Sequence, residues 1–245
     1  MSQEKETDFF IAEKNYGLGL DWYLKQFDKA RPIWGEASPN YAKIASFPGV
    51  AERIAAFRPD VKLIFVARDP VERAVSQYGH SWLSGAIDTR PEDLPGTHEF
   101  NHLLETSSYA AQLDEFQRFF PEESFLILDF DELTAHPQAI FDRVCDHVGA
   151  PRAVLNEVAA DNGADELARI PTPLLRLSRG PLRPLMLKLA SPGLRRAVKW
   201  MVSRAKPRGV PPFPEDVLAG MRNSLRDDAA RFRDMTGMPF SGWSL

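Results

Sequence analysis

Two short apolar segments, each followed by a helix signal, constrain the fold of this chain most. Residues 62–67 read K-L-I-F-V-A, and residues 124–130 read S-F-L-I-L-D-F. Runs this rich in β-branched and aromatic residues are typical of strands that are buried on both faces. After the first run, Asp69 and Pro70 suit the N-cap and first position of a helix. This alternation predicts an α/β fold, a mainly parallel sheet flanked by helices.

Apolar residues at helical spacing predict further helices around these strands. Val50, Ile54 and Phe57 lie on one stripe, and Gly149 marks the end of another such stretch. We expect helices over residues 48–57, about 107–120, 137–148 and 215–235, and a short strand over residues 33–36.

Composition excludes several classes of protein. Hydrophobic residues make up 44% of the chain and charged residues 26%, which excludes a wholly disordered or collagen-like chain. The single cysteine, Cys145, excludes an internal disulfide and a cysteine-based zinc site. No apolar run reaches the roughly 18 residues of a membrane span, and the first residues are acidic where a signal peptide would be basic. The sequence therefore predicts a cytoplasmic protein.

The charge is distributed unevenly along the chain. From Leu167 to Pro214 there are eleven Lys or Arg residues and no Asp or Glu, although the net charge of the chain is −4. Such a segment suits an anionic partner such as a charged sugar, a phosphorylated cofactor, a membrane surface or nucleic acid, or it is simply a solvated segment. We expect a core over residues 1–160, a basic Pro-interrupted segment over 161–214, and a C-terminal helix and tail over 215–245 that pack back on the core.

The segment after the first strand holds the main candidate site. Arg68 is expected at the carboxyl end of a central parallel strand, where such sheets bind ligands. The following helix N-terminus offers free N–H groups, a guanidinium binds phosphate with two hydrogen bonds, and Ser76 lies two turns further on. The alternative is that Arg68 pairs with a neighbouring carboxylate and that Ser76 packs inertly.

The string R-D-P-V-E-R-A-V-S-Q-Y, residues 68–78, resembles the 3′-phosphate-binding element of the sulfotransferases that use 3′-phosphoadenosine 5′-phosphosulfate. The chain is particularly similar to the heparan-sulfate-type branch and its bacterial relatives, which implies a fold like that of the P-loop NTPases. Further segments resemble this family in order: K-E-T-D-F-F (5–10), G-L-D-W-Y (19–23), G-E-A-S-P-N-Y (35–41), the stretch 109–131 and G-M-P-F-S-G-W (237–243).

The resemblance implies roles for individual residues. Glu6 would be the catalytic base, and Arg68 and Ser76 would bind the 3′-phosphate. Tentative acceptor contacts are Lys5, Ser38, Tyr41 and Arg208.

Two departures from the family pattern stand out. The Gly-rich K-x-G-T/S loop, which surrounds the 5′-phosphosulfate in this family, does not precede Lys5, so we expect Met1 to be an internal methionine of a longer protein. Ala37 stands where eukaryotic members often carry a catalytic Lys.

The predicted function is transfer of a sulfuryl group from this nucleotide to a hydroxyl or amine of a carbohydrate or other small acceptor. Neither a metal nor a nucleic acid is expected as a partner, whereas the basic segment 167–214 could contact a membrane surface. The alternative is an inactive, truncated relative that only binds nucleotide or an anionic partner. A weaker one is a zinc hydrolase, since His98-Glu99-Phe100-Asn101-His102 matches H-E-x-x-H.

Overall fold

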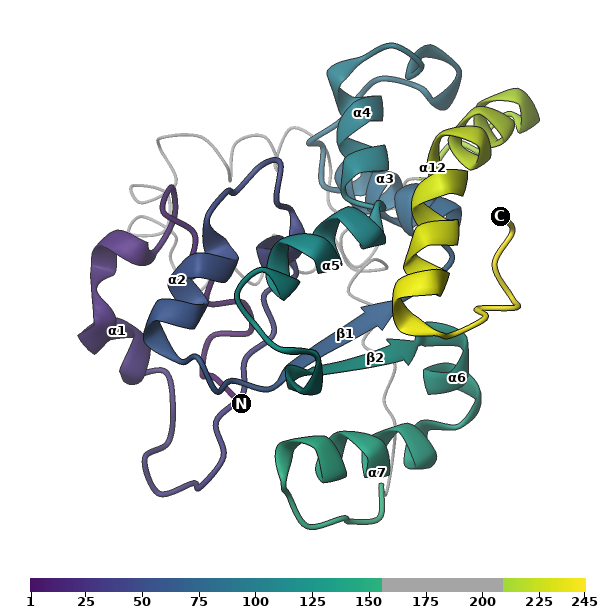
Figure 1. Ribbon diagram of the computed structural model, residues 1–245. Helices are drawn as coiled ribbons and strands as arrows, with labels where there is room; N and C mark the ends of the chain where they lie inside the picture. Colours follow the sequence, from purple (N-terminus) through teal and green to yellow (C-terminus); the bar gives the residue numbers. More distant parts are fainter. Residues whose placement is uncertain (156–208) are drawn as a thin grey trace, which may run out of the picture. The chain divides into compact units, whose positions relative to one another are not determined.

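The computed structural model describes residues 1–155 and 209–245 (Figure 1). The strands are β1 (Leu63–Ala67) and β2 (Phe125–Asp129). The helices in these ranges are α1 (Leu20–Leu24), α2 (Val50–Phe57), α3 (Pro70–Leu83), α4 (His98–Glu105), α5 (Tyr109–Gln117), α6 (Phe130–Ala135), α7 (Pro137–Val148) and α12 (Glu215–Thr236). Short 3-10 helices cover Tyr16–Leu18, Pro39–Ala42, Pro91–Asp93 and Glu122–Ser124. None of the helices described is long and apolar enough to cross a membrane.

Contacts between residues divide the chain into two compact units. Each unit is described below by itself and only for residues 1–155 and 209–245. The first comprises residues 1–72, 104–158 and 221–245, and the second comprises residues 73–103 and 159–220. The domain boundaries expected from composition, near residues 160 and 214, stay predictions.

Both strands expected from the apolar runs form, and they pair in parallel. The register runs from Leu63 opposite Phe125 to Ala67 opposite Asp129, and Figure 1 shows the strands side by side. Side chains alternate between the two faces of a strand. Ala67 is therefore fully buried, whereas Ile64 and Val66 are 43% and 44% exposed. The expectation of a sheet covered on both faces is therefore wrong for β1, because the face that carries these two side chains stays partly open to solvent.

The four segments predicted as helices from their periodicity do form helices, namely α2, α5, α7 and α12. Local chemistry sets the ends of two of them. Gly149 ends α7 and Gly237 follows α12, both with a positive φ (70° and 65°) that a residue with a side chain rarely adopts. The short strand expected over residues 33–36 is wrong. Trp34 stacks on Phe27 and donates its Nε1 hydrogen to the carbonyls of Asp28 and Arg31, so side-chain contacts hold this segment instead of a sheet.

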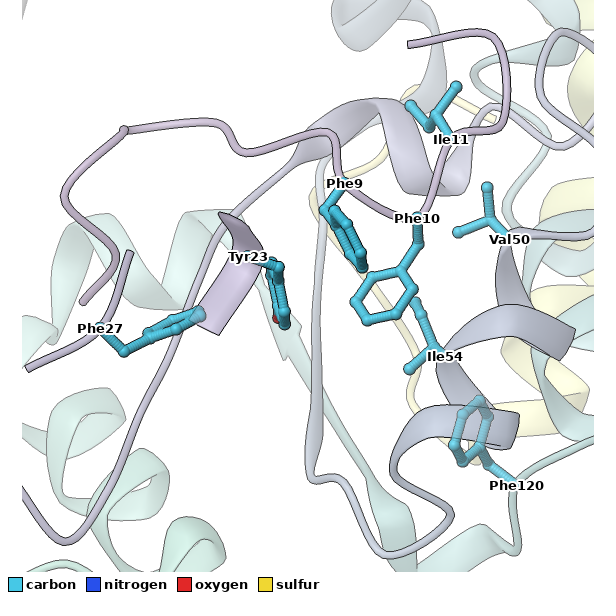
Figure 2. Packing of buried hydrophobic residues seen from close by; sticks show 8 residues of the cluster. All are labelled: Phe9, Phe10, Ile11, Tyr23, Phe27, Val50, Ile54 and Phe120. Atoms are coloured by element: carbon cyan, nitrogen blue, oxygen red, sulfur yellow. The ribbon is translucent and has the colours of Figure 1, made fainter. Parts of the chain in front are cut away.

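An aromatic cluster forms the core beneath the N-terminal segment (Figure 2). Phe9 stacks on Tyr23 with ring centroids 4.5 Å apart, and Phe10 meets Tyr23 edge-on at 5.2 Å. Each such side chain contributes about 1.5 to 3 kcal/mol when it is fully buried. The cluster comprises Phe9, Phe10, Ile11, Tyr23, Phe27, Val50, Ile54 and Phe120. It therefore fixes the chain directly after Thr7.

A second cluster joins the C-terminal helix and tail to the carboxyl end of β1. Trp243 stacks on Phe240 with centroids 4.3 Å apart and lies 5.8 Å from the ring of Tyr109. The cluster comprises Ala67, Tyr109, Ala110, Leu113, Ala229, Phe232, Phe240 and Trp243. The last residues of the chain thus pack beside the strand end that carries Arg68.

The second unit has packing of its own around Tyr78. The Tyr78 hydroxyl donates to the carbonyl of Thr89 over 3.0 Å, and its ring meets Phe213 edge-on at 5.0 Å. Trp82 donates its Nε1 hydrogen to the carbonyl of Gly209 over 3.1 Å. These contacts hold the segment before α12 against α3.

Candidate functional site

A sharp turn at Asp8 shapes the N-terminal part of the candidate site. Asp8 has φ 45°, a left-handed conformation that is uncommon for residues with a side chain. Its N–H donates to Ser38 Oγ over 3.1 Å, and its carboxylate accepts a hydrogen bond from Asn40 and pairs with Lys14. Because non-glycine residues adopt this conformation only where surrounding contacts enforce it, these partners are what hold the turn.

Directly before this turn, the side chains change from exposed to buried. Thr7 is fully buried, whereas Lys5 and Glu6 are exposed to solvent. The preceding backbone is anchored, since Ser2 N donates to the carbonyl of Gly35 and Gln3 N donates to that of Gln26. Glu6 therefore lies at the surface on a tethered segment, where its carboxylate can meet a substrate hydroxyl.

Glu36, largely buried beside Thr7, is a carboxylate to which the sequence analysis assigned no role. Glu36 Oε2 accepts a hydrogen bond from Thr7 Oγ1, which also lies 3.2 Å from the hydroxyl of Tyr41. Burial raises the pKa of Glu36 above its ordinary value, and hydrogen bonds from the hydroxyls of Thr7, Tyr41 and Tyr23 offset this only in part. The sequence signal was present, because Glu36 opens G-E-A-S-P-N-Y, but its burial depends on tertiary packing.

The two tentative acceptor residues of this stretch use their polar atoms inside the protein. Ser38 is buried and its Oγ accepts from Asp8 N. The Tyr41 hydroxyl accepts from Phe10 N over 3.3 Å, and burial together with the Glu36 charge raises the pKa of both Tyr41 and Tyr23. Both phenols therefore keep their protons at neutral pH. An acceptor contact by Ser38 or Tyr41 stays a prediction, as does one by Lys5.

Arg68 lies directly after β1, as expected, and its side chain is half-exposed. The guanidinium pairs with Glu72 over 2.8 Å and lies 5.2 Å from the ring centroid of Phe130. This is the ion pair of the alternative interpretation. Exposed pairs of this kind contribute about 0 to 1 kcal/mol. A doubly charged phosphate can therefore replace Glu72 at little cost, so Arg68 fits a phosphate ligand.

Asp69 joins the start of α3 to the C-terminal tail. Its Oδ1 accepts from Val71 N and Glu72 N over 2.8 and 2.9 Å, which confirms its predicted role as N-cap. Its Oδ2 accepts from Ser244 N. The N–H of Arg68 donates to the Tyr109 hydroxyl over 3.3 Å. The backbone that carries Arg68 is thus held from two sides.

Three further predicted residues, Ser76, His98 and His102, are on helices of the described part of the chain. Ser76 is an exposed residue of α3, and Arg208 lies outside the described residues. His98 and His102 are both on α4, in a stretch that the sequence analysis had not assigned to a helix. In residues 1–155 and 209–245, no group of three His, Cys, Asp or Glu side chains is placed to hold a metal ion.

The fold and site define an α/β protein in which an arginine side chain, that of Arg68, lies at the carboxyl end of a parallel strand. The sequence model of the sulfotransferase family matches residues 3–153, which is more than half of the chain. The chain therefore belongs to the sulfotransferase family.

Curated relatives are similar in sequence, and one solved structure is similar in fold. Human heparan sulfate glucosamine 3-O-sulfotransferase 6 is 28% identical over 97% of this chain and 64% of its own length. Human heparan sulfate glucosamine 3-O-sulfotransferase 5 is 31% identical over 54% of this chain and 41% of its own length. The chain thus spans less than two thirds of these relatives. A sulfotransferase from Alicyclobacillus acidocaldarius, 21% identical, covers 76% of this chain and 84% of its own with a TM-score of 0.52, a likeness of fold.

Proposed function

We propose that this protein transfers a sulfuryl group from 3′-phosphoadenosine 5′-phosphosulfate to a hydroxyl or amine of a carbohydrate or other small acceptor. The observation that carries the proposal is the geometry around Arg68, a weakly paired guanidinium at the end of β1 within the family match. Members of this family use that nucleotide. The curated relatives are named as sulfotransferases of heparan sulfate glucosamine, and this favours an amino-sugar acceptor.

Each proposed residue has one task in the reaction. Glu6 takes the proton from the acceptor hydroxyl, whose oxygen then bonds to sulfur. The bond between sulfur and the 5′-phosphate oxygen breaks, and adenosine 3′,5′-bisphosphate leaves. Arg68 and Ser76 bind the 3′-phosphate and so position the nucleotide. We also propose that the complete fold resembles that of the P-loop NTPases. The cytoplasmic location stays a prediction.

A transfer assay tests this function directly. The full chain is incubated with the nucleotide and with glucosamine-containing oligosaccharides, and sulfated product is detected by mass spectrometry. Simple alcohols and phenols serve as alternative acceptors. Product that depends on the nucleotide supports the proposal, and absence of transfer to every acceptor contradicts it.

Arg68→Ala tests the nucleotide site without requiring turnover. Loss of a charged partner with two hydrogen bonds should weaken the affinity for adenosine 3′,5′-bisphosphate by on the order of 2 to 4 kcal/mol. Isothermal titration calorimetry measures this, with Arg58→Ala, an exposed pair with Asp60, as the matched control. Equal affinity of wild type and Arg68→Ala would refute the assignment.

The second candidate function is a relative that binds nucleotide without turning it over. It is favoured by Ala37, which stands where eukaryotic members of the family often carry a catalytic Lys. Binding that is lost in Arg68→Ala, without transfer to any acceptor, would support this second candidate.

A further inference from the structure

Thr7 is held from both its side chain and its backbone. Its side chain is fully buried and donates to Glu36 Oε2. Its carbonyl accepts from Asn15 Nδ2 over 2.7 Å. The next residue toward the N-terminus is Glu6, which is exposed. Whatever fixes Thr7 therefore fixes the backbone from which the Glu6 carboxylate projects.

A carboxyl group at position 36 is unfavourable if its only role is to fill space in the interior. Burying a carboxyl group costs free energy unless hydrogen bonds compensate for the lost water. Glu36 Oε1 is buried and meets no hydrogen-bond partner of standard geometry in the described part of the chain. The compensation comes from hydroxyl groups, with Thr7 Oγ1 donating to Oε2 and the Tyr41 and Tyr23 hydroxyls also bonding to the carboxyl group. An apolar side chain of similar size would fill the same space without that cost.

Asp8 is held by a separate set of partners. Lys14 and Asn40 bind its carboxylate, and Ser38 accepts from its N–H. None of these contacts involves Glu36. Removing Glu36 should therefore loosen the side-chain attachment of Thr7 while its carbonyl bond from Asn15 and the contacts of Asp8 remain, which makes the contributions separable by experiment.

We propose that Glu36 is the positioning residue for Glu6: its hydrogen bond from Thr7 fixes the backbone that presents the Glu6 carboxylate to the acceptor. This inference rests on the proposed role of Glu6 as the base. Glu36 itself touches neither acceptor nor nucleotide in this scheme. Its proposed effect on Glu6 passes through Thr7.

The first test measures backbone order and needs no turnover. In Glu36→Ala and Thr7→Val, amide hydrogen exchange in the peptide covering residues 5–11 should become about tenfold faster or more, because the hydrogen bond between Thr7 and Glu36 is absent. Glu36→Gln and Thr7→Ser, which keep an acceptor and a donor, should exchange as the wild type does. Exchange in α7 is the internal reference. Unchanged exchange at residues 5–11 in both disruptive variants would overturn the inference.

The second test is a kinetic cycle with Glu6→Gln. Glu36→Ala alone should lower kcat by about 10- to 100-fold, since a small misplacement of a reacting group has effects of this size. KM for the nucleotide should stay within about twofold. In the Glu6→Gln background, Glu36→Ala should cause no further loss, because the group that it positions is already absent. A loss of equal size in both backgrounds would mean a general structural role and would overturn the inference.

The outcomes distinguish this inference from the proposed function. Normal turnover of Glu6→Gln would overturn the base assignment and with it the task given to Glu36. Slow turnover of Glu6→Gln with unchanged exchange in Glu36→Ala would overturn the inference about Glu36 alone. If Glu36→Ala does not fold, Thr7→Val, which removes the same bond and keeps the volume, decides both tests.

Discussion

Glu6 and Glu36 differ in what surrounds their carboxylates, and this difference sets their chemistry. Glu6 lies at the surface, where a substrate hydroxyl can reach it. Glu36 is enclosed by the hydroxyls of Thr7, Tyr23 and Tyr41, and burial raises its pKa. A group that exchanges a proton with a substrate needs access, whereas a group that holds a neighbour in place needs enclosure. The two glutamates therefore suit two different roles.

Replacing Glu6 should abolish most of the turnover. Because Gln cannot accept the acceptor proton, Glu6→Gln should lower the rate of sulfuryl transfer by about 10²-fold or more. Affinity for adenosine 3′,5′-bisphosphate should stay close to that of the wild type. Glu4→Gln, which removes an equally exposed charge two residues away, serves as control. Near-normal turnover of Glu6→Gln would rule out Glu6 as the base.

Glu36 should also leave a mark on how stability depends on pH. A raised pKa means that the folded protein binds the Glu36 proton more tightly than the unfolded chain does. The contribution is therefore fully present below the ordinary value of 4.5 and is lost as pH rises through the folded-state pKa. Glu36→Gln has no such proton. The free energy of unfolding of wild type minus that of Glu36→Gln should fall as pH rises above 4.5, measured by denaturant unfolding at several pH values. A difference that does not vary with pH would contradict this.

At the scale of elements, one side chain connects a helix start with the end of the chain. Asp69 caps α3 through two N–H groups and also accepts from Ser244 N. Asp129 caps α6 through a single bond from Asp131 N, 3.0 Å long. Both aspartates cap a helix, but only Asp69 also binds the C-terminal tail. Comparing the two therefore shows how much the tail contact contributes.

Asp69→Ala should destabilise the protein more than Asp129→Ala does. Loss of an N-cap costs about 0.5 to 2 kcal/mol, typically about 1. For Asp69 a further bond to Ser244 is lost, with a net contribution of about 0.5 to 1.5 kcal/mol. We expect a total of about 1 to 3.5 kcal/mol for Asp69→Ala in thermal or denaturant unfolding. Equal losses in the two variants would show that the tail contact contributes nothing.

For the whole molecule, the separation of charge is the feature with the widest reach. Residues 167–214 carry eleven cations and no carboxylate, while the rest of the chain holds all 34 acidic residues. A cationic segment attracts anionic surfaces through interactions that salt screens, with a Debye length of about 10 Å at 0.1 M. We therefore propose that this segment binds an anionic acceptor or membrane surface.

Vesicle binding tests this proposal in the full chain. Vesicles that contain phosphatidylserine should retain the protein at low ionic strength, and retention should fall steeply as salt is raised toward about 0.5 M, where the Debye length is only a few Å. Neutral phosphatidylcholine vesicles are the control. Equal retention by both kinds of vesicle, or retention that salt does not change, would instead indicate a solvated segment without a membrane role.

Local chemistry made much of the fold predictable from the sequence. The strand L-I-F-V-A, the Asp69-Pro70 start of α3 and the Pro137–Gly149 limits of α7 each depend on neighbouring residues. The same holds for the placement of Arg68 directly after β1, since a strand end is set by the run that precedes it. The motif segments likewise indicated the family before any contact was known.

Only the tertiary structure decided which polar groups became enclosed and which apolar ones stayed exposed. Ser244 and Asp69 are 175 residues apart in the chain, and Thr7 and Glu36 are 29 apart, so no local pattern relates them. Ile64 and Val66 were expected in a covered strand and are exposed instead. Burial, and with it the raised pKa of Glu36, depends on which distant segments displace water from a side chain. The sequence thus determined the elements and the candidate residues, and packing between distant segments determined their environments.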